Sequence, residues 1–395
     1  MRVVVVTGPR QAGKSTFVEH HPDLVGRPYL TLDESVLLRR ARDNPAAFVR
    51  SEQRMTIDEV QRAPDLVLAI KAVVDRQRPS IRGQFVLTGS ANLLMMKQIG
   101  DSLAGRAHYL RLWPMTRREQ LGLGCTGNWE TFFEHDTADW LDAVRAYKAP
   151  QADWRAQCAR GGFPEVAIVS GGLPEADRAL WFDGYVTTYL ERDLRDLAAI
   201  ADLADFQHVM QAGALRIGNL LNQSELGRDV QLPAMTIHRY LNVLETSYQI
   251  IRLQPYSVNR TKRLIKTPKL YWNDTALALY LGAQGADVEP SGAHFENLVL
   301  CDLLAWRDLQ TPRAEVSYWR TAAGYEVDFL IEWRRQLVGV EVKASTQPTL
   351  RDVRGLRAFL SEHPKTARGG VVLHGGKDSY WLDDKIVAVP WWRVM

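Results

Sequence analysis

Two side chains near the start of the chain have the types and spacing needed to hold a phosphate and its metal ion. They are Lys14 and Ser15, in a segment that fits the pattern G-x-x-x-x-G-K-S. Its residues are Gly8, Pro9, Arg10, Gln11, Ala12, Gly13, Lys14, Ser15 and Thr16. In such a segment backbone N–H groups surround a β-phosphate, the lysine contacts β and γ oxygens, and the serine hydroxyl ligates Mg²⁺. We therefore expect the whole segment to bind a nucleoside triphosphate, taken as ATP, with Mg²⁺.

A second set of polar residues follows two apolar segments further along the chain. Asp58 and Glu59 come after Met55-Thr56-Ile57. There the aspartate would hold magnesium through water, and the glutamate would act as the general base on the attacking water. The apolar segment 84–88 ends just before Ser90 and Asn92, either of which could contact the γ-phosphate. Both are also good helix N-caps, and this alternative stays open.

A third set, near the end of the chain, has the spacing of a metal-dependent nuclease. Asp328 is followed after twelve residues by Glu341, and Lys343 comes two residues later, which is the PD-(D/E)xK pattern. The two acids would share Mg²⁺ or Mn²⁺, and Lys343 would activate the water that attacks a phosphodiester. Glu296 is expected to add an acid from a preceding helix. The alternative is an amphipathic hairpin with charges on a solvent-facing side.

A buried strand is predicted to position the first set. Four consecutive valines, Val3 to Val6, suit a strand covered on both faces in a parallel sheet. Because this strand leads directly into the glycine-rich segment, a chance turn that contains Lys-Ser is the weaker alternative.

A hairpin is predicted to position the third set. Segments 325–333 and 336–344 alternate with period two around Arg334-Arg335, and a helix over 294–308 precedes them. The alternation places Glu341 and Lys343 on one face of their strand. Buried acids and a buried lysine on that face would need a metal ion or each other.

The middle of the chain has a helix-turn-helix pattern. Helices are predicted over 224–230 and 234–245, joined by Gln231-Leu232-Pro233. Apolar residues at i, i+3, i+4 and i+7 would pack the second helix, whose outward face carries one certain cation, Arg239. We interpret this region as a winged-helix domain that is poorly equipped to bind DNA with that helix alone.

A basic segment follows, and it is the better candidate for contact with DNA. Five cations lie within ten residues, namely Arg260, Lys262, Arg263, Lys266 and Lys269. On a wing, such a segment would follow a phosphate backbone. We assign DNA contact to Arg239 and to the first four of these cations. The alternative is that the segment docks against an acidic surface or a nucleotide within an oligomer.

Composition limits the class of protein. The 395 residues are 46% hydrophobic and 24% charged, a globular balance, and the length predicts roughly two to four domains. A net charge of +3 gives no overall field that would favour nucleic acid or membrane. No apolar stretch is long enough to span a membrane or act as a signal core, so we expect a cytoplasmic protein without a membrane partner. Three dispersed cysteines exclude a disulfide framework.

Several further segments carry a resemblance to a known family. They are Leu103-Ala104-Gly105-Arg106, 112–116, 161–165, 189–193, 318–321 and 350–359. With the motifs above, they resemble an uncharacterised family of prokaryotic AAA-type ATPases over nearly the whole chain. The resemblance implies that Arg106 senses the nucleotide. A surface ion pair is the alternative for Arg106.

We therefore expect an α/β protein in four parts. These are an AAA-type ATPase core with a parallel sheet (1–120), a helical lid or connecting region (121–200), a winged-helix domain (201–282) and a restriction-endonuclease-like domain (291–395). The expected function is ATP hydrolysis by Lys14, Ser15, Asp58 and Glu59, coupled to DNA binding and to metal-dependent cleavage. The alternative is a regulatory ATPase switch that binds nucleic acid or protein without cutting. AAA-type enzymes commonly take a catalytic arginine from a neighbour, so a homo-oligomer or a protein partner is expected.

Overall fold

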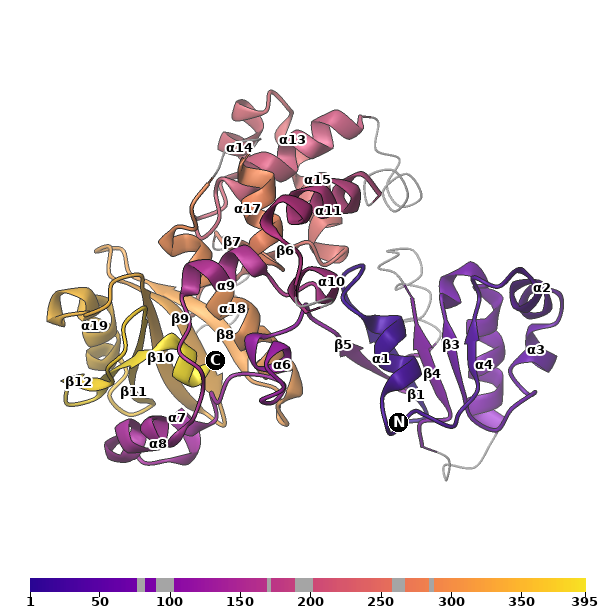
Figure 1. Cartoon of the computed structure of the whole chain (residues 1–395), viewed down its shortest axis with the longest axis horizontal. Coiled ribbons are helices and arrows are strands. Elements are labelled where there is room, and N and C mark those ends of the chain that lie inside the picture. The colour runs from indigo at the N-terminus through magenta and orange to yellow at the C-terminus, as the bar shows by residue number, and fades with distance from the viewer. Residues whose placement is uncertain (77–81, 90–102, 169–171, 189–201, 258–266, 284–287) are drawn as a thin grey trace. The chain divides into compact units, whose positions relative to one another are not determined.

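A computed structural model describes residues 1–76, 82–89, 103–168, 172–188, 202–257, 267–283 and 288–395. The chain divides into two compact units. The first holds residues 1–114 with two short later segments, and the second holds the rest of the described chain. Both are drawn in Figure 1.

The first unit is built on a parallel sheet of five strands. In spatial order these are β2 (Tyr29–Thr31), β3 (Met55–Asp58), β4 (Phe85–Thr88), β1 (Val3–Thr7) and β5 (Ala107–Arg111). Strand β4 lies between β1 and β3, so the carboxyl ends of these three strands share one edge of the sheet. The predicted parallel sheet is thereby confirmed.

Helices cover both faces of this sheet. They are α1 (Lys14–His20), α2 (Ser35–Asp43), α3 (Pro45–Phe48) and α4 (Asp65–Arg76), with a 3₁₀ turn at Val60–Arg62. Val3 and Val5 join the core that α4 completes, whereas Val4 and Val6 pack with Val18 of α1. The run of valines is therefore covered on both sides, as expected for a parallel strand.

The second unit contains a mixed sheet of six strands. In spatial order these are β12 (Tyr380–Asp383), β13 (Ile386–Pro390), β11 (Ala367–His374), β10 (Gln336–Lys343), β9 (Glu326–Trp333) and β8 (Glu315–Arg320). Strands β9 and β10 form the predicted antiparallel hairpin. Arg334 and Arg335 at its turn both have positive φ, 51° and 65°, as two-residue hairpin turns require.

Two helices pack with this sheet. They are α18 (Gly292–Leu309), before β8, and α19 (Arg354–Glu362), between β10 and β11. Leu356 and Phe359 of α19 share a core with Val327 and Val372. The order in the chain is α18-β8-β9-β10-α19-β11, with β10 parallel to β11.

The middle region supplies three helices, a two-stranded sheet and a further helix. They are α13 (Leu203–Ala214), α14 (Gln223–Asp229), α15 (Ala234–Thr246), β6 (Ile250–Leu253), β7 (Lys269–Trp272) and α17 (Thr275–Ala283). The two helices of the predicted helix-turn-helix end within one residue of the expected positions. Ile237 and Tyr240 are buried, whereas Met235 and Arg239 are exposed, so the inner and outer faces of α15 are confirmed.

Short helices lie between and after these elements. They are α6 (Arg117–Gln120), α7 (Thr131–Glu134), α8 (Trp140–Ala146), α9 (Trp154–Arg160), α10 (Pro164–Ala167), α11 (Glu175–Thr188) and α20 (Trp391–Val394), with 3₁₀ turns at Thr137–Asp139 and Leu350–Val353.

Residues 127–146 are integrated into the C-terminal part of the second unit. The Trp129 indole N–H and the Gly127 amide donate to Asp302 of α18, at 2.6 and 2.9 Å. Trp129 and Trp140 are fully buried. The irregular sequence predicts a connecting or lid-like segment here. Residues 127–146 instead extend the C-terminal core, because their tryptophans fill that core.

No helix in the part of the chain that the structure describes is both long and apolar enough to cross a bilayer.

Candidate functional site

The glycine-rich segment after β1 forms a cradle of backbone N–H groups. Gly8, Gln11 and Gly13 have positive φ of 141°, 56° and 86°, the kind of backbone that turns successive N–H groups toward one anion. At Gly8 a Cβ would lie 2.1 Å from the Leu112 carbonyl oxygen, so only glycine fits there. Lys14 opens α1, and its ammonium donates to the Gly8 and Pro9 carbonyls at 3.3 and 2.7 Å.

The acidic pair lies at the end of β3, on the same edge of the sheet. Asp58 is the last residue of β3 and is buried, and Glu59 follows with a positive φ of 54°. Burial, with the charges of Asp58 and Asp33, raises the pKa of Glu59. A general base works best when its pKa approaches the working pH. Gln61 donates a hydrogen bond to Glu59, a contact that the sequence alone did not indicate.

Ser90 and Asn92 follow β4, between β1 and β3, and both lie outside the described residues. Their contact with the γ-phosphate stays a prediction.

Tyr29 of β2 connects the two expected magnesium ligands. Its hydroxyl donates to Asp58 Oδ2 at 2.6 Å and also hydrogen-bonds the Ser15 side chain. Burial and the Asp58 carboxylate raise its pKa, so it stays protonated and able to donate. The hydroxyl and carboxylate donors, together with the backbone cradle, fit Mg²⁺ and a phosphate. A bound Mg²⁺ would compete with the Tyr29 hydroxyl for these two oxygens.

We expect Tyr29→Phe to bind Mg²⁺-nucleotide more tightly, by roughly 3- to 10-fold, because one hydrogen bond to a charged group no longer has to be broken. Titration with a fluorescent ADP analogue at varied Mg²⁺ measures this change. Tyr109→Phe, at an exposed position of β5, is the matched control. Weaker binding by Tyr29→Phe would mean that the hydroxyl helps to hold the ion.

Arg106 lies at the surface of the first unit. Its guanidinium pairs with Asp75 of α4 at 2.5 Å. The Arg106 and Asp75 side chains are 34% and 42% exposed. This contact is the surface ion pair considered as the alternative for Arg106. A nucleotide-sensing role, which stays a prediction, would require Arg106 to leave Asp75.

The C-terminal candidates come together at one place in the second unit. Asp328 and Glu341 lie on neighbouring strands and are each 7% exposed, and the Val342 amide donates to Asp328 Oδ2 at 2.9 Å. Glu296 projects from α18 and accepts a hydrogen bond from the Tyr271 hydroxyl at 3.1 Å. Burial, then the nearby Asp328, raises the pKa of Glu296 to about 8. The predicted cluster therefore exists, and its face is buried rather than solvent-facing.

Two lysines neutralise these acids. Lys343 donates to Glu341 Oε1 at 2.6 Å. Lys269 pairs with Glu326 at 2.5 Å and lies 4.0 Å from Glu296. Burial acts to lower the pKa of both lysines, but the surrounding carboxylates outweigh it and raise their pKa.

A metal ion does not fit this arrangement. Within the described ranges, no three His, Cys, Asp or Glu side chains are close enough to hold one. The carboxylates of Glu296, Asp328 and Glu341 have the donor chemistry of a Mg²⁺ or Mn²⁺ site. The positive charges next to them, however, are lysine ammonium groups. The arrangement gives no support to metal binding by Glu296, Asp328 and Glu341, which stays a prediction.

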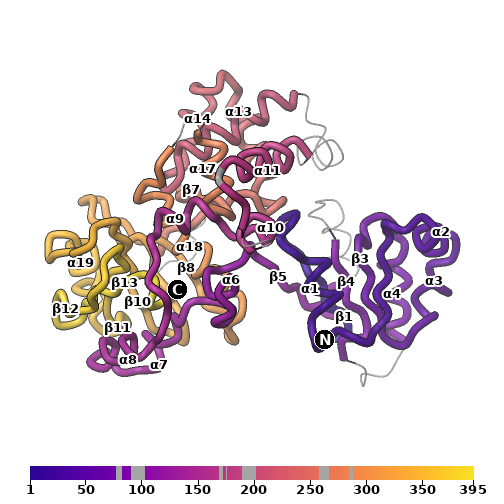
Figure 2. The backbone as a smooth tube through the Cα atoms, viewed as in Figure 1, coloured from indigo at the N-terminus to yellow at the C-terminus, as the bar shows by residue number. Residues whose placement is uncertain are grey.

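Lys269 and Tyr271 are the members of this cluster that sequence reasoning missed. Both come from β7 of the middle region, although in the sequence Lys269 belongs to the basic segment. The alternation in Lys269–Trp272 places the two side chains on one face of the strand, which is the signal that could have found them. Strand β7 lies beside α18 (Figure 2). The Asn297 side chain of α18 accepts from the Trp272 amide and donates to the Trp272 carbonyl, at 2.7 and 2.9 Å.

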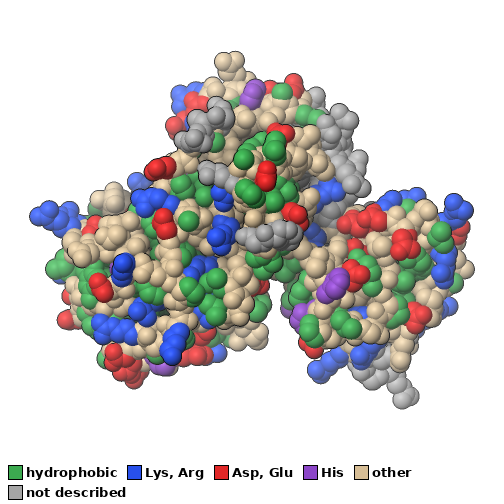
Figure 3. Space-filling model, in the orientation of Figure 1, with side chains coloured by type: hydrophobic (Ala, Val, Ile, Leu, Met, Phe, Trp, Pro, Cys, Tyr) green, Lys and Arg blue, Asp and Glu red, His purple; other side chains and the backbone are tan. Residues whose placement is uncertain are grey.

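The predicted DNA-contacting cations are only partly described. Arg260, Lys262, Arg263 and Lys266 lie outside the described residues. Arg239 is exposed on α15, and its guanidinium lies over the Tyr240 ring, 5.3 Å from the ring centroid. Within each unit, basic and acidic side chains are interspersed on the face shown in Figure 3.

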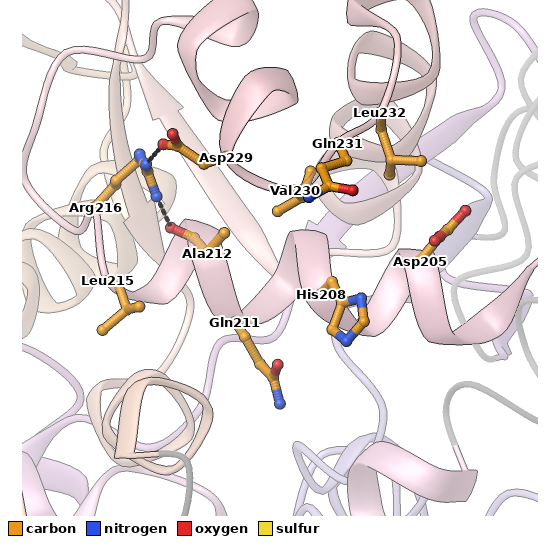
Figure 4. A pocket seen from close by; sticks show the side chains of 10 residues that line it. All are labelled: Asp205, His208, Gln211, Ala212, Leu215, Arg216, Asp229, Val230, Gln231 and Leu232. Carbon is orange, nitrogen blue, oxygen red and sulfur yellow. Dashed lines mark hydrogen bonds and ion pairs between the residues drawn. The ribbon is translucent and has the colours of Figure 1, made fainter.

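A hollow of about 810 Å³ adjoins the helix-turn-helix. It lies between α13 and the turn after α14, and Figure 4 shows its lining side chains. Arg216 spans one end, where it pairs with Asp229 and donates to the Ala212 carbonyl at 2.9 Å. Its polar lining, which includes His208 and Gln231, belongs to neither predicted site.

Comparison with known proteins assigns the first part of the chain to a domain family. Residues 1–121 match the AAA domain, which supports an ATPase-type function. Residues 151–288 and 291–394 match two domains of unknown function, DUF8612 and DUF4143.

Similar proteins occur in distant organisms. The uncharacterized protein Rv2008c of Mycobacterium tuberculosis is 32% identical over 399 residues, covering 98% of this chain and 80% of that protein. An uncharacterized protein of Haemophilus influenzae is 23% identical over 326 residues, covering 76% of this chain and 74% of that protein. RuvB of Thermotoga maritima is 16% identical, and the match covers 64% of this chain and 81% of the RuvB chain. The TM-score of 0.28 is too low to support a conclusion.

Proposed function

The chain belongs to the family of the uncharacterized Mycobacterium tuberculosis protein Rv2008c, and from this premise we propose that it is an ATP-hydrolysing AAA-type enzyme. The observation that carries the proposal is the cradle of backbone N–H groups after β1, with Asp58 and Glu59 on the same edge of the sheet. The anion cradle, the metal ligands and the general base thus lie at one edge of the parallel sheet, where β1 and β3 end on either side of β4.

Each residue of this site has a role in the proposal. The N–H groups of the glycine-rich segment bind the β-phosphate, and Lys14 leaves the Gly8 and Pro9 carbonyls to contact the β and γ oxygens. Ser15 and Asp58 would hold Mg²⁺, which neutralises charge on the phosphates when bound. Glu59 takes the proton from the attacking water and holds it on its carboxylate. Gln61 positions Glu59 through their hydrogen bond.

We further propose that this ATPase is coupled to DNA binding by the middle region. Three helices followed by the antiparallel pair β6 and β7 match the element order of a winged helix, and the basic segment falls where its wing would be. The order α18-β8-β9-β10-α19-β11 supports a restriction-endonuclease-like domain with Asp328, Glu341 and Lys343 at its centre.

The C-terminal domain has two candidate functions within this proposal. One is metal-dependent DNA cleavage with Lys343 as the catalytic lysine. The other is a regulatory switch that binds nucleic acid or protein without cutting. The pairing of Lys343 with Glu341 and of Lys269 with Glu326 favours the switch, because the acids already have cations.

One experiment tests the ATPase and separates the two candidates. Purified protein is incubated with supercoiled, linear and single-stranded DNA, with Mg²⁺ or Mn²⁺, with and without ATP, and phosphate release is followed in the same tubes. Release that Lys14→Ala abolishes supports the ATPase, and no release from the wild type rejects it. Cleavage that Lys343→Ala abolishes establishes the nuclease, whereas release without any cleavage favours the switch.

Replacing the four cations of the basic segment by alanine tests the coupling to DNA. We expect weaker binding to any DNA sequence. The slope of log K against the logarithm of the salt concentration should become shallower by about 3 to 4, near one unit per lost phosphate contact. The replaced residues are Arg260, Lys262, Arg263 and Lys266. The control replaces two exposed arginines of the C-terminal domain, Arg351 just before α19 and Arg354 at its first position. Fluorescence anisotropy at several salt concentrations measures the slope, and an unchanged slope would place DNA elsewhere.

The proposal keeps the four-part organisation 1–120, 121–200, 201–282 and 291–395 as its working domains, with residues 127–146 packed on the last of them. It includes self-association, through which a neighbour could supply an arginine to the nucleotide, and a cytoplasmic location where Mg²⁺ and ATP are available. Sedimentation with and without nucleotide tests the self-association.

A further inference from the structure

The last residue of β5, Arg111, carries a guanidinium that lies over two aromatic rings. The guanidinium is 5.0 Å from the centroid of the Trp113 ring and 4.7 Å from the centroid of the Tyr248 ring. An arginine within about 6 Å of a ring centroid is attracted to the face of that ring. The guanidinium therefore joins the residues that follow α15 to strand β5.

Tyr248 has a backbone conformation that glycine would favour. It follows the end of α15 with a positive φ of 64°. The Gln249 amide donates to the Leu244 carbonyl at 2.8 Å, which closes the helix. At this position after a helix, glycine or asparagine usually adopts the left-handed conformation. A tyrosine is strained there, and such strain persists only where the surrounding structure holds the residue, often in switch regions.

The end of α15 belongs to the same unit as the nucleotide site. Residues 242–249 are grouped with residues 1–114 in the first unit, whereas residues 202–241 belong to the second. Within the first unit the Gln249 side-chain amide donates to the Tyr185 hydroxyl of α11 at 3.1 Å, and both residues are buried. The second helix of the helix-turn-helix therefore begins in the second unit and ends beside Arg111 in the first.

The backbone around Arg111 contacts the phosphate cradle. Arg111 lies opposite Thr7, the last residue of β1. The Leu112 amide donates to the Thr7 carbonyl at 2.8 Å, and a Cβ on Gly8 would lie 2.1 Å from the Leu112 carbonyl oxygen. The Gly8 carbonyl is also one of the two that Lys14 leaves when it contacts a phosphate. A phosphate that orders the cradle therefore also orders the segment that carries Arg111.

We propose that Arg111 and Tyr248 couple the nucleotide site to the helix-turn-helix, so that a bound nucleotide fixes the end of α15 through the contact between guanidinium and ring. Because α15 carries Arg239 on its exposed face, the same contact makes DNA binding by the middle region depend on nucleotide. The coupling is reciprocal, so DNA strengthens nucleotide binding by the same factor. This inference rests on the proposed nucleotide binding and deepens the proposed coupling to DNA, but its test needs no DNA.

The test is hydrogen exchange of the full chain with and without saturating Mg²⁺-ADP, followed in peptides that cover residues 242–249. In the wild type, nucleotide is expected to slow this exchange by about fivefold, the lower end of typical couplings between sites. Tyr248→Gly and Arg111→Met should each abolish the change. Glycine suits the positive φ at position 248, so this variant keeps its fold. Tyr248→Phe keeps the ring and should keep the change, and Arg50→Met, at an exposed position of the same unit, should behave as wild type.

Nucleotide binding is measured on the same samples with a fluorescent ADP analogue, which separates this inference from the ATPase. Binding by the wild type without any change in exchange at residues 242–249 would overturn the inference and leave the ATPase in place. A change that persists in both Tyr248→Gly and Arg111→Met would also overturn it, because the signal would then follow another route. No nucleotide binding by the wild type would reject the proposed function and this inference together.

Discussion

Glu59→Gln is expected to bind ATP like the wild type and to hydrolyse it at least about 100-fold more slowly. Glutamine keeps the shape of the side chain but cannot accept the proton of the attacking water, and general-base catalysis contributes roughly 10²- to 10⁴-fold. Binding should persist because the N–H cradle, Lys14 and Ser15 are untouched. The variant should therefore trap ATP.

Phosphate release and retention of labelled ATP on the purified variant measure the two parts of this result. Glu52→Gln, an exposed acid of the same unit, is the matched control. Because burial raises the pKa of Glu59, wild-type turnover should fall with decreasing pH and begin to fall above the usual range for a glutamate. Unchanged turnover in Glu59→Gln would reject Glu59 as the base and point to another acceptor.

Residues that act within a short local pattern could be predicted from the sequence. The valine strand and the glycine-rich segment predict β1 and the cradle because valines that alternate between two covered faces suit a parallel strand, and glycines suit the turn at Gly8 and Gly13. The β9–β10 hairpin was predictable because period-two alternation with a two-residue turn fixes both the strand ends and the register.

Residues that depend on contacts between distant segments could not be predicted in the same way. Tyr29 reaches Asp58 only because β2 pairs with β3, and a three-residue strand has no period to read. Lys269 is separated from Glu326 by two helices and a strand in the sequence. In a basic segment a lysine is expected to face solvent. The pairing of strands and the docking of β7 decide both positions.

Irregular composition was also misleading in residues 127–146. Glycines, tryptophans and acids interrupt any period over 121–149, so the sequence indicated a connection. Trp129 and Trp140 instead give this stretch its place, because each buries a large side chain, and the Trp129 indole N–H also donates to the buried Asp302. This polar segment with two buried tryptophans is therefore better interpreted as a packed extension than as a lid.

Lys343→Met is expected to destabilise the C-terminal sheet by about 3 kcal/mol at pH 8, because removing one partner leaves a buried carboxylate without its ion pair. Glu341 is 9% exposed in its side chain and has Lys343 as its hydrogen-bond partner at 2.6 Å. The exposure of Lys343, 30%, places the cost at the lower end of the range for buried pairs. Lys343→Met/Glu341→Gln should recover more than half of the loss, since neither charge then remains.

The cost should depend on pH in a definite direction. Burial and Asp328 already raise the pKa of Glu341, and Lys343 opposes this rise. Without Lys343 the folded state therefore keeps a proton on Glu341 that the unfolded chain releases above its ordinary pKa of about 4.3. The stability of Lys343→Met should fall as pH rises from 5 to 8, whereas the double variant should lack this slope.

Urea unfolding in EDTA, followed by pulsed hydrogen exchange of β10, measures the loss of stability and its dependence on pH. Lys365→Met, at an exposed position, is the control. An equal loss of stability in the single and double variants would show that the Lys343–Glu341 ion pair does not stabilise the fold. The interpretation of the cluster as acids neutralised by lysines would then be wrong.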